Sequence, residues 1–295
     1  MILRDFLTEH YAITHNLKAR TVMLFASSID RFRDCLGREP EFGDLNDLTV
    51  SKFLRWRAVT PHRGKIVRPA SVAKDKAHIV SLWNAAAKKR LVDHFPDLAR
   101  NIVKVPHVVP HAYTVGEVSA MIRAAQNRLG FIGPCPAPWF WCSLIMAAWF
   151  TGERVGSLLA IRWAEADTHG HTLTFLSEHR KGMGRTITRS ISPGLSTWLE
   201  AGRRQPSDLV WPWTDHRKIN TIYQRLQKIC WNAGVEPHGF HSIRKAAGSY
   251  VQLGGGDSTE FLTHASDKTT RDHYLSPRVI KEKSVIDLLP PLDLG

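Results

Sequence analysis

Apolar residues recur at helical spacing in the first third of the chain. Between Lys18 and Leu36 they fall at steps of three or four residues, which places them on one face of an amphipathic helix that Gly37 would end. These residues are Val22, Phe25, Ile29, Phe32 and Leu36. We expect a second helix in residues 48–58 and a third from Pro69 to about residue 92. The apolar face of this third helix carries Val72, Ile79, Trp83 and Ala87.

A connector separates this helical region from the rest of the chain. Pro106 and Pro110 disfavour regular helix and favour extended backbone. We therefore predict a helical domain in residues 1–105, a linker in residues 106–112 and a second domain in residues 113–295.

The second domain is expected to be mainly helical around a small sheet, with its first helix starting at about Thr114. The uncharged run 129–152 is interrupted by prolines, which leaves Trp139–Phe150 as a helix shorter than the ~20 residues of a membrane span. It is typical of a buried core helix. Residues 171–192 alternate β-branched and polar side chains on both sides of residues 182–184, which predicts a hairpin or small sheet.

Basic residues outnumber acidic ones. The chain has 40 Lys and Arg against 27 Asp and Glu, a formal net charge of +13 and a pI near 9.9. Such a field attracts polyanions, and nucleic acid is the expected partner. The excess is larger toward the N-terminus, with 19 basic against 11 acidic residues through residue 105. A merely solvated basic surface would show the same excess, so the arrangement of residues must decide.

Cysteine usage and the N-terminal residues bear on the compartment. The chain has four scattered cysteines, at Cys35, Cys135, Cys142 and Cys230. They form no Cys-x-x-Cys pair, so neither a zinc ribbon nor a disulfide framework is indicated. The start "MILRDFLTEHY" carries Arg4, Asp5 and Glu9 where a signal peptide would need an apolar core. We expect a cytoplasmic, nucleoid-associated protein and no membrane partner.

Three stretches of the second domain carry cations, histidines and a tyrosine in a specific order. They read "TGERVGSLLAIRW", "HGFHSIRKAAGSY" and "LTHASDKTTRDHYLSP". This order resembles the signature boxes of the tyrosine recombinase (phage integrase) family, of the form Thr-Gly-x-Arg, His-x-x-Arg and Leu-Gly-His followed by Tyr. The resemblance covers the whole chain, because residues 1–105 resemble the family's core-binding domain and residues from about 112 its catalytic domain.

The resemblance implies a role for each residue that matches a box. Arg154 and Arg244 would bind the non-bridging oxygens of one scissile phosphate through their guanidinium groups. His241, one helical turn before Arg244, would act as a general acid-base residue, and His264 would complete the pocket. Tyr274 would be the nucleophile that holds a 3′-phosphate covalently.

A hairpin lysine, here Lys181, would protonate the leaving 5′ oxygen, with Arg180 and Arg185 as close competitors.

The chain also departs from the family's pattern. Thr263 stands where the family usually has the glycine of Leu-Gly-His, and Ser157 stands where it often has an acidic residue that supports the pocket. The tyrosine follows the third-box histidine by ten residues, where many members show nine.

The activity implied by the resemblance is site-specific DNA recombination, or integration, through a 3′-phosphotyrosyl intermediate. The implied architecture is a mainly α, two-domain, C-shaped clamp around duplex DNA, which assembles as a homo-oligomer, a tetrameric synapse, with possible accessory DNA-bending proteins. The family's chemistry needs no cofactor and no metal. Candidate DNA-binding residues cluster in and after the third helix: Lys74, Lys76, Lys88, Lys89 and Arg90.

Two alternative functions share these features. A tyrosine-type relaxing topoisomerase would use the same cations and phenol without exchanging partners. An architectural DNA-binding protein would keep the fold without catalysis. The chain end from Arg278 offers an apolar helix face for docking on a neighbouring protomer, as the family does. That face would carry Val279, Ile280, Val285, Ile286 and Leu289.

Overall fold

The computed structural model describes residues 1–99, 103–106, 108–180 and 185–280. The chain divides into two compact units, Met1–Val108 and Val109–Gly295, which we call unit 1 and unit 2. Lys181 and residues 281–295, including Val285, Ile286 and Leu289, lie outside the described residues. Their predicted roles stay predictions.

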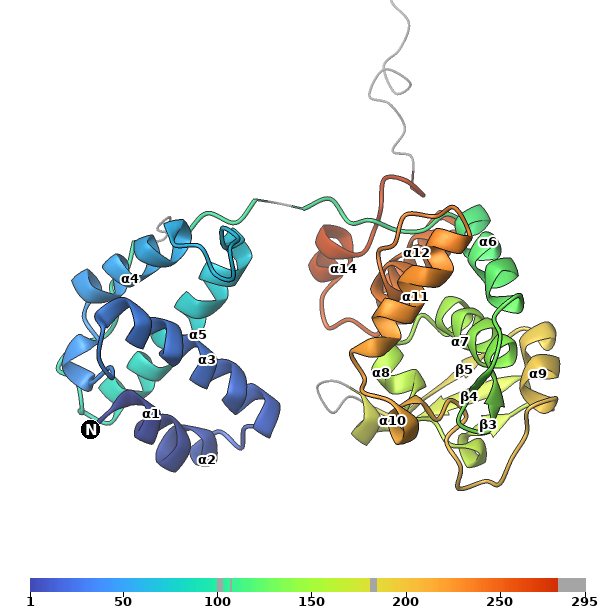
Figure 1. Cartoon of the computed structure of the whole chain (residues 1–295), viewed down its shortest axis with the longest axis horizontal. Helices are drawn as coiled ribbons and strands as arrows, with labels where there is room; N and C mark the ends of the chain where they lie inside the picture. The colour runs from blue at the N-terminus through green and yellow to red at the C-terminus, as the bar shows by residue number, and fades with distance from the viewer. Residues whose placement is uncertain (100–102, 107, 181–184, 281–295) are drawn as a thin grey trace, which may run out of the picture. The chain divides into compact units, whose positions relative to one another are not determined.

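Unit 1 is built from helices (Figure 1). In chain order they are α1 (Leu3–Asp5), a π-helical segment (Phe6–Tyr11), α2 (Ala12–Thr14), α3 (Ala19–Leu36), a 3-10 turn (Phe42–Asp44), α4 (Asp47–Val59) and α5 (Pro69–Lys88). The three helices expected from periodicity are confirmed as α3, α4 and α5. Gly37 ends α3 in the left-handed conformation, with φ 74°, as a C-terminal glycine commonly does.

The core of unit 1 forms where the apolar faces of its helices meet. Phe32 of α3, Phe53 of α4 and Trp83 of α5 are fully buried in it. Leu3 and Phe6, from the N-terminal helical segment, are buried in the same core. The hydrophobic pattern had not indicated that segment, whose helical pieces are short.

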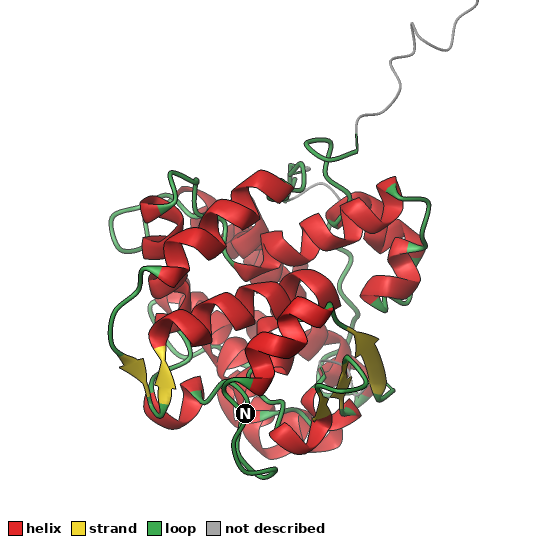
Figure 2. Cartoon of the chain, turned by 90° about the vertical axis from the view of Figure 1, so that its right-hand side faces the viewer, coloured by secondary structure: helices red, strands yellow, loops and turns green. Residues whose placement is uncertain are grey.

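Unit 2 combines helices with two small antiparallel sheets (Figure 2). The helices are α6 (Val115–Gln126), α7 (Ala137–Thr151), α8 (Val155–Leu158), α9 (Pro193–Glu200), α10 (Trp213–His216), α11 (Thr221–Asn232), α12 (Phe240–Leu253), α13 (Ser258–Leu262) and α14 (Asp267–His273), with 3-10 turns at Trp163–Glu165 and Ser177–His179. The strands are β1 (Phe131–Ile132), β2 (Cys135–Pro136), β3 (Ala166–Asp167), β4 (Thr172–Phe175) and β5 (Ile187–Ser190). The predicted mainly α class with a small sheet is confirmed.

The larger sheet has the order β3-β4-β5. In its register, Thr172 pairs with Ser190 and Phe175 pairs with Ile187. This sheet is the predicted hairpin with one further strand, β3, added at the edge. The β1-β2 pair before α7 was not predicted, because each of its strands has only two residues.

The uncharged helix α7 lies at the centre of unit 2. Its Phe140, Leu144 and Ile145 are fully buried. The polar Ser143 is satisfied internally, because its hydroxyl donates to the carbonyl of Trp139 at 2.7 Å and accepts from Nε1 of Trp211 at 2.9 Å. The helix is therefore a core helix, as predicted, and starts two residues earlier than expected.

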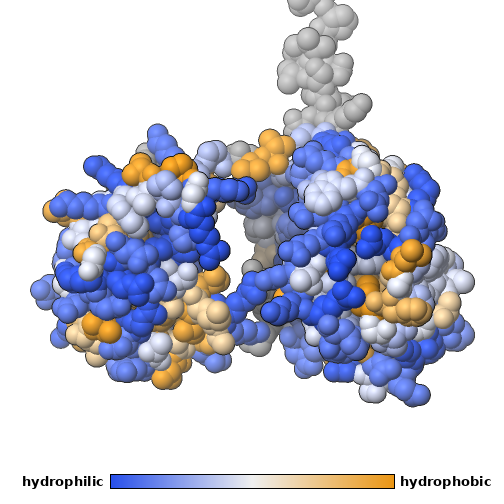
Figure 3. All heavy atoms as spheres, viewed as in Figure 1, coloured by the Kyte–Doolittle hydropathy of each residue, from blue (hydrophilic) through white to orange (hydrophobic). Residues whose placement is uncertain are grey.

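The apolar faces of the helices in each unit pack into the core of that unit. Hydrophilic side chains dominate the visible face of each unit (Figure 3). Within the described ranges, no helix combines the length and the apolar character that a membrane crossing requires.

Candidate active site

The end of α7 turns sharply into the first of the three boxes. Gly152 has φ 60°, and a Cβ at this position would lie 2.5 Å from Cε1 of Phe261. Both the left-handed conformation and this close approach favour glycine. Arg154 follows directly as the residue before α8, half-buried. Its guanidinium has no hydrogen-bond or ion-pair partner among the residues that the structure describes.

Arg244 of α12 joins three segments of the site. Its side chain is 1% exposed and donates to the carbonyl of Gly152, to the carbonyl of Leu262 at 2.5 Å and to Nε2 of His264 at 3.2 Å. Burial, followed by the nearby charge of Arg154, lowers the pKa of Arg244. Its Nε has no partner in the described part of the chain, and a buried unpaired donor is costly. An anion at this point would satisfy it.

The tautomer of His264 follows from its two hydrogen bonds. Because Arg244 can only donate, Nε2 of His264 accepts, so the neutral ring carries its proton on Nδ1 and donates to Oγ1 of Thr270 at 2.9 Å. Burial, and then the charges of Arg244 and Arg154, lower the pKa of His264 to about 4. The ring is therefore neutral at pH 7.

Tyr274 lies directly after α14 with its ring packed into the same site. The ring centroid is 4.1 Å from that of His264 and 5.1 Å from that of His241, and the guanidinium carbon of Arg244 lies 5.5 Å away. The residue is 8% exposed. Ser249 fixes its backbone, because the serine hydroxyl donates to the carbonyl of Tyr274 at 3.2 Å.

His241 lies at the start of α12, on the exposed side of the site. Although part of the ring reaches solvent, crowding by protein atoms and the charges of Lys245, Arg244 and Arg154 lower its pKa to about 4. The three cations and the local crowding act in the same direction, so the neutral imidazole is favoured. The site thus presents a phenol and two neutral imidazoles beside Arg154 and Arg244.

Sequence comparison finds similarity to tyrosine recombinases. The chain is 24% identical over 309 aligned positions to a putative tyrosine recombinase XerC of Pseudomonas syringae, covering 92% of this chain and 61% of that protein. It is 20% identical over 280 positions to the tyrosine recombinase XerD of Halalkalibacterium halodurans, covering 91% of each. Against the XerC relative of Pseudomonas aeruginosa it spans 48% of the relative's length. No protein-family model matches the chain.

The fold is also found in solved integrases. A lambda integrase dimer bound to a COC′ core site matches with a TM-score of 0.69 at 18% identity, over 100% of this chain and 81% of that one. The Tn1549 transposon integrase in complex with transposon right end DNA also gives 0.69, at 10% identity, over 98% and 97%. The chain is thus similar to tyrosine recombinases in sequence and to solved integrases in fold.

The first departure from the tyrosine recombinase pattern leaves the local turn intact. Thr263 adopts the left-handed conformation, φ 52° and ψ 46°, that a glycine adopts easily. His264 is held in this turn by a bond from its backbone amide to the carbonyl of Thr259, 3.0 Å long. At the second departure, Ser157 donates to the carbonyl of His179 at 3.3 Å.

The residues near the predicted leaving-group acid can be described in part. Lys181 lies outside the described residues. Its competitor Arg180 is buried and engaged with the carboxylate of Glu153 at 3.2 Å, the hydroxyl of Thr263 and the carbonyl of Arg185 at 2.8 Å. Because both terminal nitrogens of the guanidinium are held by these contacts, Arg180 is poorly placed to follow a leaving oxygen. Arg185 is exposed.

Three supporting residues escaped the sequence interpretation: Glu153, Ser249 and Thr270. Glu153 belongs to the quoted first box, but only the fold reveals that its carboxylate is buried among arginines. Ser249 lies five residues after the second-box arginine on the buried side of α12. Its polarity on an otherwise apolar helix face was the available signal.

The basic surface includes the predicted residues and a second group. Lys74, Lys88, Lys89 and Arg90 are exposed, and Lys76 donates from Nζ to the carbonyl of Ala99 at 3.4 Å. Lys88 and Lys89 line a groove of about 490 Å³ in unit 1. Unit 2 has a groove of about 320 Å³, at the start of α11, that the sequence interpretation missed. Its basic lining residues are Arg217, Lys218, Arg225 and Lys228.

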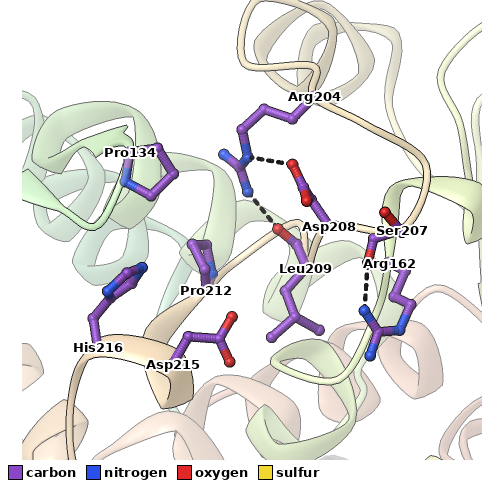
Figure 4. Close-up of a pocket in the computed structure, with 9 residues that line it drawn as sticks. All are labelled: Pro134, Arg162, Arg204, Ser207, Asp208, Leu209, Pro212, Asp215 and His216. Atoms are coloured by element: carbon purple, nitrogen blue, oxygen red, sulfur yellow. Dashed lines mark hydrogen bonds and ion pairs between the residues drawn. The ribbon is translucent and has the colours of Figure 1, made fainter.

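One further pocket, of about 260 Å³, lies apart from the candidate site residues (Figure 4). Its two arginines are already engaged, Arg162 with the carbonyl of Ser207, and Arg204 with the carbonyl of Leu209 and, at 3.7 Å, with Asp208. We assign no function to it.

The first residues after the active-site segment pack on unit 2 itself. Val279, expected on a face for a neighbouring protomer, is buried in the core of unit 2. Arg278 pairs with Glu117 of α6 at 2.9 Å. Any docking segment would therefore start later than Arg278.

Proposed function

We propose that this chain cuts and rejoins DNA at specific sites through a 3′-phosphotyrosyl intermediate. The observation that carries the proposal is the packing of Tyr274 against His241 and His264, with the guanidinium of Arg244 beside the same ring. Residues far apart in the sequence bring a phenol, two neutral imidazoles and a cation to one place. This is the set of groups that phosphoryl transfer to a tyrosine requires.

In the first step, the phenolic oxygen of Tyr274 forms a bond to phosphorus, and the bond from phosphorus to the 5′ oxygen breaks. His241 accepts the phenolic proton, because its lowered pKa keeps the imidazole neutral at pH 7. Lys181 donates a proton to the leaving 5′ oxygen. Arg154 and Arg244 hold the non-bridging oxygens, whose negative charge grows in the transition state.

In the second step, a 5′ hydroxyl of another strand attacks the phosphotyrosine and releases Tyr274. One phosphodiester is exchanged for another, so the bond energy is conserved in the intermediate. Strand exchange needs several protomers on DNA, and the lambda integrase structures contain a dimer on a core site and a tetramer on a Holliday junction. We propose a homo-oligomer of the same kind for this chain, a tetrameric synapse.

Both units would contact the DNA. In unit 1 the contacts would come from the lysines of the α5 groove, and in unit 2 from the basic residues of α11. Phosphate contacts of this kind fix position, while base contacts would give the site preference. The exposure of Lys88, Lys89 and Lys228 and the partial exposure of Arg225 support the proposal.

The proposal is tested with a library of nicked duplexes of random sequence. Cleavage beside a nick releases a short fragment, so the covalent adduct accumulates and survives SDS. The wild-type chain should yield adducts with a selected sequence, and Tyr274→Phe should yield none. DNA binding without any adduct would instead indicate the architectural function, and adducts in Tyr274→Phe would refute the assignment of the nucleophile.

A plasmid carrying two copies of the selected sequence distinguishes a recombinase from a relaxing topoisomerase. A recombinase should give deletion or inversion products whose junctions lie within the selected sequence. Relaxation of supercoils without such products would indicate a topoisomerase.

A further inference from the structure

One buried carboxylate lies among the cations of the site. Glu153 is 2% exposed, and its Oε1 accepts from Arg180 at 3.2 Å. Its other oxygen, Oε2, has no hydrogen-bond partner among the described residues. Its charge also acts on Arg244 and on Arg189 of β5, favouring the protonated form of each. A single negative charge therefore faces several guanidinium groups.

Arg180 connects Glu153 to two other segments of the site. Besides Glu153, it donates to the hydroxyl of Thr263 and to the carbonyl of Arg185 at 2.8 Å. One guanidinium thus links three segments: the turn after α7, the connection between β4 and β5, and the turn after α13. Because that last turn leads directly into His264, a shift of Arg180 would be transmitted to the imidazole.

A second arginine makes a parallel link. Arg189 of β5 donates to the carbonyl of Phe261 in α13 and lies over the ring of the same phenylalanine, 5.2 Å from its centroid. Strand β5 therefore contacts α13 at Phe261, and the connection between β4 and β5 contacts the following turn at Thr263. Only the arginine that contacts Thr263, Arg180, is also ion-paired with Glu153.

The two departures from the family's pattern meet at this link. Ser157 donates to the carbonyl of His179, the residue before Arg180, and its neutral hydroxyl supplies no charge to the guanidinium. Glu153 supplies that charge from the other side of Arg154. At position 263, a glycine would give the same turn, but only a hydroxyl can accept from Arg180. Each unusual residue thus has a contact that explains it.

We infer that Glu153, Arg180 and Thr263 form a positioning brace that holds the turn before His264 against the turn that carries Arg154. The inference rests on the proposed function and deepens it, since the brace acts only through the residues that touch the phosphate. Glu153 is a positioning residue, because it is buried and acts through its ion pair with Arg180.

The test uses the nicked duplex recovered from the library, with the full chain. Glu153→Gln keeps the shape of the side chain but removes its charge, so the cleavage rate at saturating DNA should fall about 10- to 100-fold, as expected for a small misplacement of reacting groups. The dissociation constant for DNA should stay within about threefold of wild type, since uniform binding is untouched. Glu153→Asp, which restores the charge, should recover part of the rate.

Glu178→Gln provides the matched control, because Glu178 is an exposed acid close to Arg180 in the sequence. It should cleave at the wild-type rate. Wild-type cleavage by Glu153→Gln, an equal loss of binding and rate, or a Glu153→Asp rate as low as that of Glu153→Gln would overturn the inference. Absence of adducts with the wild-type chain would instead refute the proposed function.

A second pair of variants decides the matter if Glu153→Gln does not fold. Thr263→Val keeps the branched shape but removes the hydroxyl, and Thr263→Ser keeps the hydroxyl. Loss of a hydrogen bond to a charged group predicts cleavage about tenfold slower in Thr263→Val, with Thr263→Ser close to wild type. Equal rates in the two variants would contradict the brace.

Discussion

Each unit buries a carboxylate, and the two differ in how fully they are paired. In unit 1, Asp75 is 1% exposed and accepts at one oxygen from Ser28 at 2.7 Å and at the other from Arg57 at 3.0 Å. In unit 2, Glu153 is similarly buried, yet one of its oxygens has no partner in the described part of the chain.

The arginines around these carboxylates differ less clearly. Nε of Arg57 is bonded to Asp75, whereas Nε of Arg31, which pairs with Asp75 at 3.6 Å, has no partner among the described residues, and neither has Nε of Arg180 or Arg244. Buried polar groups are normally satisfied, so unpaired ones call for an explanation. We interpret the Asp75 cluster, in which both carboxylate oxygens are paired, as structural, and we propose that the unpaired Nε of Arg244 donates to a phosphate.

The largest expected effect comes from breaking the Asp75 cluster of unit 1. Asp75→Ala leaves Arg57 buried without its counter-charge, which should lower the unfolding free energy of unit 1 by about 3–5 kcal/mol. Hydrogen exchange of the amides of α3 and α5 measures this. The molecules that remain folded should cleave DNA at the wild-type rate, and a selective loss of cleavage would place Asp75 in the active site instead.

Arg244→Ala is the corresponding change in unit 2. It removes a donor to the phosphate, so cleavage should fall about 10²–10³-fold, the cost typical of losing one transition-state hydrogen bond. It also leaves the carbonyls of Gly152 and Leu262 without their partner. Single-turnover rates with the nicked duplex, corrected for the folded fraction, check the prediction. A loss explained entirely by unfolding would make Arg244 structural, like Arg57.

His241 and His264 of unit 2 predict a pH effect on stability. Their pKa values are lowered from 6.5 to about 4 in the folded chain, so the unfolded chain binds more protons between these values. Unfolding free energy should therefore fall as the pH drops from about 6.5 to about 4. His241→Gln combined with His264→Gln should flatten this dependence in chemical unfolding of DNA-free protein. An unchanged slope would mean that other groups cause it.

The smallest effects are expected from surface charges in the two units. Lys88→Gln with Lys89→Gln in unit 1, and Arg225→Gln with Lys228→Gln in unit 2, should each reduce the salt dependence of DNA binding by about one unit of slope per lost phosphate contact. Titrations at several salt concentrations measure the slope. An effect confined to one pair would show that only one unit contacts DNA.

The elements that could be predicted from the sequence are those whose own pattern of apolar and polar residues determines which face is buried. Helices α3, α5 and α7 were recognisable because periodicity or a continuous apolar run sets which side is buried. The segment around Phe6 was missed because its helical pieces are short, and β1-β2 because a pair of two-residue strands leaves no alternation to detect. Arg154, His241, Arg244, His264 and Tyr274 came from motif order, and their convergence depends on tertiary packing.

The role of Glu153 could not be predicted from its neighbours in the sequence. An acid beside Arg154 is ordinarily a solvated residue, and its burial depends on Arg180 and Thr263 folding against it. The same holds for Ser249, whose contact with the backbone of Tyr274 joins positions 25 residues apart.

The covalent link between Tyr274 and DNA is the central claim, and mass spectrometry of the trapped adduct tests it most directly. After nuclease and protease digestion, the account predicts a peptide containing Tyr274 that carries a nucleotide through its 3′-phosphate, together with a released strand bearing a 5′ hydroxyl. A nucleotide on another residue such as Tyr250, or a 5′-phosphate linkage, would contradict the account.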